Sequence, residues 1–143
     1  MTVTAIADPT SLEGCEIYFD AALPGFPGVH RFQLSPWGDK DGPFRLMVSL
    51  DAPELAFVVV EPEPFFPDFA VEIDRATADR LGLANPDEAV VHLIVTLGRS
   101  PVEATVNLLG PVVVNRRNLL AAQVVLDGPS DRLRTPLIGP KAF

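Results

Sequence analysis

The chain has 143 residues and a formal net charge of −8, with 48% hydrophobic and 21% charged residues. This length predicts one domain spanning residues 1–143, because domains cluster near roughly 100 to 150 residues, and the composition excludes a disordered tail. No apolar run approaches the roughly 20 residues that cross a bilayer, and the first residues resemble no targeting segment, so we expect a cytoplasmic protein with no membrane contact.

The charge also bears on the class of partner. Nineteen acidic residues against eleven basic ones argue against direct binding of nucleic acid, because the chain would repel phosphates. The charge favours a basic protein partner, although solubility alone would also account for it. Cys15 is the only cysteine, which excludes an internal disulfide and a cysteine-rich zinc site.

Fifteen prolines and ten glycines separate short apolar runs, a pattern typical of many short strands joined by turns. The expected fold is therefore mainly β: a small, barrel-like arrangement of antiparallel strands, closed or nearly closed so that free edges are removed. The predicted strands span residues 16–19, 31–34, 44–49, 56–60, 69–73, 89–97, 103–108, 112–114 and 121–126.

Two acidic stretches interrupt the first strands. Asp39 and Asp41, in WGDKDGPF, resemble half of a calcium loop, but a turn is favoured because Asp and Gly dominate turns. In EPEPFFPDF, residues 61–69, three prolines favour an extended backbone at a sheet edge or in a surface loop. That stretch supplies three carboxylates and three aromatic rings: Glu61, Glu63, Phe65, Phe66, Asp68 and Phe69.

The aromatic rings of residues 61–69 have two interpretations. They either hold a long loop on the core, which we favour, or form an apolar contact surrounded by negative charge. On an extended backbone Phe65 and Phe66 would point in opposite directions, leaving one of them facing outward.

Residues 74–82, DRATADRLG, predict one short helix in an otherwise β chain. Asp74 suits the N-cap and Gly82 the left-handed stop, while Leu81 and Leu83 would pack the helix onto the sheet.

Residues 89–97, AVVHLIVTL, alternate between two faces of a strand. The odd-numbered residues from Ala89 to Leu97 form an apolar face, whereas the other face is only half polar. This pattern predicts a central strand that is covered on both sides. His92 lies on the second face, and we expect it to be hydrogen-bonded or at the surface rather than a metal ligand.

In TVNLLGPVVVNRRN, residues 105–118, Asn107 and Asn115 flank an apolar run that is broken by Gly110 and Pro111. The amides either cap adjacent strands by bonding backbone groups at this turn, which we favour, or recognise a partner's backbone. Elsewhere neither histidine lies in a catalytic or metal motif, and no glycine-rich phosphate loop is present, so no cofactor, metal or catalytic residue is expected.

Four stretches together resemble the flagellar assembly factor FliW family: LPGF at 23–26, PFRLMVSLDAPELAFVVVEPEPFFPDF at 43–69, TVNLLGPVVVN at 105–115 and AAQVVL at 121–126. Their order and spacing match as well. The resemblance implies a small, barrel-like protein that is not an enzyme and that binds flagellin and the RNA-binding translational repressor CsrA. Export of flagellin would free the protein to capture CsrA and so lift its block on flagellin messenger RNA.

Two alternatives remain at this point. A small-ligand-binding or hydrolytic barrel would use carboxylates and His92 in the barrel mouth. A passive chaperone would shield flagellin without regulating translation. For the FliW-like function, the expected contact residues are the acidic and aromatic residues of 61–69 together with Asn107 and Asn115.

Overall fold

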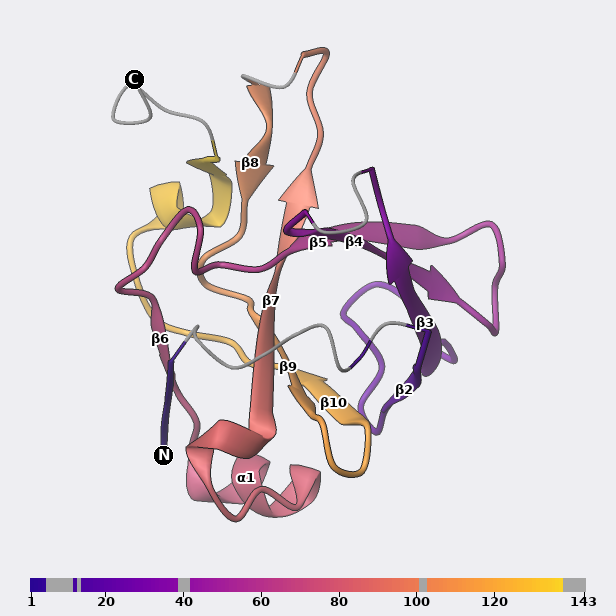
Figure 1. Cartoon of the computed structure of the whole chain (residues 1–143), viewed down its shortest axis with the longest axis vertical. Helices are drawn as coiled ribbons and strands as arrows, with labels where there is room; N and C mark the ends of the chain where they lie inside the picture. Colours follow the sequence, from indigo (N-terminus) through magenta and orange to yellow (C-terminus); the bar gives the residue numbers. More distant parts are fainter. Residues whose placement is uncertain (5–11, 13, 39–41, 101–102, 138–143) are drawn as a thin grey trace.

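A computed structural model describes residues 1–4, 12, 14–38, 42–100 and 103–137 (Figure 1). The turn expected at Asp39 and Asp41 lies outside the described residues. The strands are β1 (Thr2–Thr4), β2 (Glu16–Phe19), β3 (Arg31–Pro36), β4 (Phe44–Ser49), β5 (Ala56–Val60), β6 (Ala70–Glu72), β7 (Ala89–Thr96), β8 (Thr105–Val106), β9 (Val112–Asn115), β10 (Leu120–Gln123) and β11 (Thr135–Pro136). The helices are α1 (Arg75–Leu81) and the 3-10 helices η2 (Pro86–Glu88) and η4 (Ser130–Arg134).

Seven of the described strands form a closed barrel, in the order β7, β5, β4, β3, β2, β10 and β9, with β9 pairing back to β7. The prediction of a mainly β, barrel-like fold is confirmed. One detail is corrected: β2 and β10 run parallel, whereas the other neighbours in the ring are antiparallel. Strand direction cannot alternate all the way around a closed ring of seven, so at least one parallel junction is unavoidable.

The inside of the barrel is filled by side chains from all seven strands. Phe32 lies at the centre of this group, with its ring centroid 5.4 Å from that of Phe19 and 6.1 Å from that of Phe57. The alternation of each strand directs these residues inward. The buried inward-facing apolar residues on the strands are Ile17, Phe19, Phe32, Leu34, Met47, Val59, Val90, Val112, Val114 and Ala121.

A second core covers the outside of β7. Ala89, Val91, Leu93 and Val95 pack there against α1 and the β1–β6 pair, so the expectation of a central strand covered on both sides is confirmed. Leu97 does not follow this pattern: β7 ends at Thr96, and Leu97 is 52% exposed.

Helix α1 forms as its capping residues predict. The Asp74 carboxylate accepts a hydrogen bond from the Thr77 N–H at 2.8 Å, and Gly82 has a φ of 68°. Leu81 and Leu83 are both buried in the outer core, which confirms that the helix packs on the sheet through them.

His92 contradicts its prediction. Its side chain is 2% exposed, and neither ring nitrogen has a hydrogen-bond partner among the described residues. Burial, and then the positive charge of Arg45, lower the pKa of His92 to about 4. The error arises because the second face of β7 points into a closed barrel and not toward solvent.

Candidate partner-binding site

The loop between β5 and β6, residues 61–69, is built from turns. The N–H groups of Phe65 and Phe66 donate to the Pro62 carbonyl at 3.0 and 2.7 Å, and the Phe69 N–H donates to the Phe66 carbonyl at 2.9 Å. The surface-loop prediction holds, but the extended backbone is wrong, because a proline at a turn position fixes φ without requiring extension. Phe65 and Phe66 were expected to point in opposite directions only on an extended backbone, so that expectation no longer applies.

The three phenylalanines anchor this loop. Phe69 is 9% exposed, and Phe65 and Phe66 are half-buried against the outer core. The ring of Phe65 also meets that of Phe44 edge to face, with centroids 6.1 Å apart. This arrangement favours the interpretation in which the rings hold the loop, while leaving parts of Phe65 and Phe66 at the surface.

The three carboxylates of the loop have different positions. Glu63 and Asp68 are exposed. Glu61 instead forms an ion pair with the buried Arg45, with 3.3 Å between the Glu61 carboxylate and the guanidinium. Only the first two are therefore positioned to attract a basic partner.

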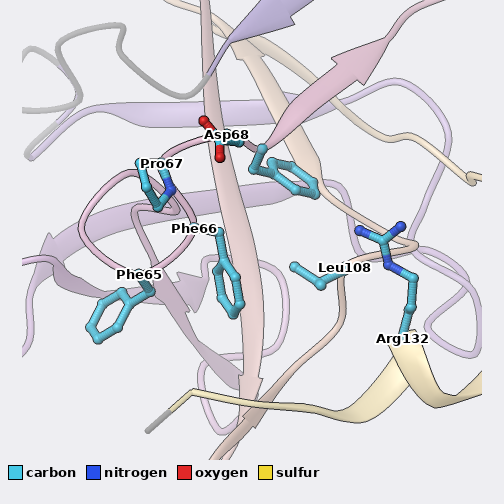
Figure 2. Close-up of a pocket in the computed structure, with 7 residues that line it drawn as sticks. Phe65, Phe66, Pro67, Asp68, Leu108 and Arg132 are labelled. Atoms are coloured by element: carbon cyan, nitrogen blue, oxygen red, sulfur yellow. The ribbon is translucent and has the colours of Figure 1, made fainter. Parts of the chain in front are cut away.

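The exposed side of the loop borders a groove (Figure 2). One part of the groove has a volume of about 260 Å³, and the adjoining part, about 250 Å³, extends past Ala70 to Leu126 and Asp127. Figure 2 shows the Arg132 side chain beside Leu108, facing the loop that bears Phe66 and Asp68. The first part is lined by Phe65, Phe66, Pro67, Asp68, Phe69, Leu108 and Arg132.

Sequence reasoning did not assign Leu108 and Arg132 to this site. Their positions depend on a long-range backbone bond in which the Leu108 N–H donates to the Arg132 carbonyl at 2.9 Å, holding η4 against the chain after β8. A single sequence carries no local signal for that contact. The groove therefore combines half-buried rings with two carboxylates, Asp68 and Asp127, and one guanidinium.

Asn107 and Asn115 have separate structural roles. The Asn107 side-chain oxygen accepts from the Leu109 N–H at 2.9 Å, next to the turn as expected. A Cβ added at Gly110 would lie 2.6 Å from the Gln123 side-chain nitrogen and 2.8 Å from that of Asn107, so both amide groups would have to shift.

Asn115 acts elsewhere, so the expected pairing of the two amides is wrong. It is 0% exposed, donates to the Leu81 carbonyl at 2.8 Å and accepts from the Arg117 N–H at 2.9 Å. It thus joins the end of β9 to the end of α1. The strands β8 and β9 are not neighbours either, since each pairs separately with β7. Because of its burial, Asn115 is left out of the contact surface proposed below.

Replacing Asn107 by alanine is expected to lower the free energy of unfolding by about 1 kcal/mol, because the Leu109 N–H loses its acceptor. Chemical denaturation measures this. The control is Asn107→Asp, which keeps an acceptor oxygen and should remain close to wild type. Unchanged stability with lost partner binding would contradict the capping role and favour direct recognition.

Other kinds of site find no support in the residues described. Among them, no three His, Cys, Asp or Glu side chains are grouped so that they could hold a metal ion. No helix in the described part of the chain is long and apolar enough to span a membrane. The candidate site therefore rests on surface shape and charge.

The chain matches known proteins over most of its length. The family model of the FliW protein matches residues 4–137. The chain belongs to the FliW family. A FliW protein from Magnetococcus marinus, named flagellar assembly factor, is 39% identical over 124 residues, which cover 85% of this chain and 74% of that protein. A second one, from Bacillus subtilis strain 168, is 36% identical over 123 residues, or 86% of this chain and 85% of that protein.

The fold also matches a solved FliW structure. A crystal structure of the flagellar assembly factor FliW superposes with a TM-score of 0.76 at 27% identity, covering 90% of this chain and 88% of that one. The resemblance seen in the sequence motifs is thus confirmed at the level of family and fold.

Proposed function

We propose that this FliW family member is a cytoplasmic, non-enzymatic flagellar assembly factor that binds flagellin and the translational repressor CsrA. Family membership over residues 4–137 is the observation that carries the proposal. In this scheme flagellin and CsrA compete for the chain, so that export of flagellin releases it to bind CsrA and relieve repression of flagellin messenger RNA. It needs no cofactor and no contact with nucleic acid.

The groove beside residues 61–69 is the surface we assign to CsrA. A basic RNA-binding protein is attracted by a chain with a net charge of −8. Asp68 brings negative charge to the groove itself, and the exposed Glu63 lies on the same loop. The half-buried rings of Phe65 and Phe66 supply apolar area at its centre. The charges speed association with CsrA, and burial of the rings slows dissociation of the complex.

The first test is direct mixing. Purified chain is combined with flagellin and with CsrA at micromolar concentration and physiological salt, and comigration on a sizing column is measured. We expect each to bind and flagellin to displace CsrA. If both bind without displacement, the partner switch is wrong. If neither binds, the proposal fails.

Neutralising the two exposed carboxylates of the loop with Glu63→Gln and Asp68→Asn together is expected to raise the Kd for CsrA about tenfold, mainly by slowing association. The double variant Glu54→Gln, Asp87→Asn is the matched control, because it removes the same charge from exposed positions outside the groove. Surface plasmon resonance at two salt concentrations measures both. Equal effects in the two variants would show that overall charge, and not this groove, attracts CsrA.

The alternative of a ligand-binding or hydrolytic barrel has little to support it. The described interior is filled mainly by aromatic and aliphatic side chains around Phe32, with the buried His92 on the inward face of β7. Glu61 is paired with Arg45, and His92 lines neither part of the groove described above.

A further inference from the structure

Beyond the end of β10 at Gln123, backbone hydrogen bonds continue a strand-like pairing with residues 109–111. The Val124 N–H donates to the Pro111 carbonyl at 2.9 Å, and the Leu126 N–H donates to the Leu109 carbonyl at 2.8 Å. Successive backbone groups of a strand point to opposite sides. The N–H and C=O of Val125 therefore point away from the segment 109–111.

The side of the chain to which these Val125 groups point has no partner strand among the described residues. β2 pairs with β10 only at Leu120 and Ala121, because β2 ends at Phe19. No described residue makes a backbone hydrogen bond to Val125, and its side chain is 80% exposed, the largest value among the exposed large hydrophobic residues. Val125 thus lies on an open strand edge.

A narrow groove of about 210 Å³ runs along this edge. Its other wall is formed by α1, which packs beside β10 (Figure 1), and by the loop after β2. The loop and the helix contribute mostly small side chains, so the edge is reachable by a slim extended chain but not by the broad edge of a second barrel. The residues that line the groove are Ala21, Ala22, Pro24, Thr77, Arg80, Ala122, Gln123 and Val125.

Proteins usually protect an open edge with lysine, proline or a buried charge. The residues 123–126, QVVL, contain none of these, which indicates an edge kept available. Arg80 is the only charged residue among the described residues that line the groove, and its guanidinium lies 3.7 Å from the Asp20 carboxylate. This ion pair balances the charge, so the groove suits a mainly apolar segment.

We propose that this edge, centred on Val125, binds an extended, mainly apolar segment of an unassembled protein subunit, which adds to the sheet as a strand through backbone hydrogen bonds. Resting on the proposed function, the occupant is a segment of flagellin. This surface is distinct from the acidic groove that we assign to CsrA. Flagellin and CsrA then compete because binding at one site weakens binding at the other, and not because they occupy the same surface.

The test compares Val125→Pro with Val125→Thr. Proline removes the N–H that would bond the segment, and the wild-type fold does not use that N–H among the described residues. Threonine keeps the N–H and the branched shape. We expect Val125→Pro to raise the Kd for purified flagellin about tenfold, Val125→Thr to bind like wild type, and both to keep wild-type melting temperatures and CsrA affinity.

Amide hydrogen exchange gives a second readout on the unmodified chain. The Val125 amide should exchange rapidly alone and become protected when flagellin is added. The Val124 and Leu126 amides, which already have acceptors, should change little and serve as internal controls.

Each outcome is decisive. Normal flagellin binding by Val125→Pro overturns the strand-addition proposal while the proposed function stands. Equal loss in Val125→Thr also overturns it, because the side chain and not the backbone would then be recognised. Protection of the Val125 amide at high concentration without flagellin would show a second copy on the edge and would overturn the proposal. If wild type does not bind flagellin, the proposed function fails and this proposal falls with it.

Discussion

Replacing Phe32 by alanine is expected to lower the free energy of unfolding by about 3 to 5 kcal/mol. Phe32 is 0% exposed, and its ring lies between Phe19 and Phe57 at the centre of the barrel interior. Truncation leaves a cavity that the closed ring of strands cannot collapse to fill. Because domains are stable by only about 5 to 15 kcal/mol, much of the chain's stability would be lost. Urea denaturation followed by circular dichroism measures the change.

Tyr18→Ala is the matched control for this substitution. Tyr18 lies on the neighbouring strand β2, pairs with Arg31 next to Phe32, and is 43% exposed on the outer face. Its removal should cost less, about 1 to 2 kcal/mol, since the half-exposed ring leaves no enclosed cavity. A similar loss for Phe32→Ala and Tyr18→Ala would mean that the interior is not tightly packed, and would revive the idea of a ligand-holding barrel.

The second large effect is a loss of stability between pH 6.5 and pH 4. The pKa of His92 falls from 6.5 in the unfolded chain to about 4 in the folded protein, because burial and then the charge of Arg45 disfavour the imidazolium. Between these values the unfolded chain binds a proton that the folded chain does not, so unfolding becomes more favourable as the pH falls. The contribution of neutral His92 to the free energy of unfolding is intact above pH 6.5, and about 3 kcal/mol of it is lost by pH 4.

His92→Leu isolates this effect. The variant keeps every other titrating group, so the difference between its pH profile and that of wild type belongs to His92. Its free energy of unfolding should vary by about 3 kcal/mol less over the same window. Asp51 does not interfere, because backbone hydrogen bonds from His30 and Arg31 lower its pKa to about 2, and its contribution is lost only in stronger acid. An NMR titration of the wild type checks the assignment directly, and a His92 pKa near 6.5 would refute it.

The elements that were predictable are those with strong local signals. The Asp74 cap, the Gly82 stop and the two leucines, Leu81 and Leu83, determine α1 within a ten-residue stretch. The alternation of β7 likewise marks a strand buried on both faces. β1 and β11 were missed because strands of 3 and 2 residues are too short to show alternation.

The site was only partly predictable, for a physical reason. The carboxylates and rings of residues 61–69 are evident from the sequence. The turns around Pro62 that orient them depend on packing against Phe44 and the outer core. Arg132 reaches the groove through a contact with Leu108 across 24 positions of the chain. The environment of His92 depends on barrel closure, which alternation alone does not reveal, because an open sheet has the same alternation.

The parallel junction between β2 and β10 fixes when this protein can finish folding. It joins residues about a hundred positions apart, Tyr18 with Leu120 and Phe19 with Ala121. During synthesis one edge of β2 therefore stays unpaired until β9 and β10 have left the ribosome. Such long-range pairing is slow, on the millisecond to second scale, and exposed edges invite aggregation. A cell that makes this protein must tolerate an unclosed nascent sheet for nearly the whole length of its translation.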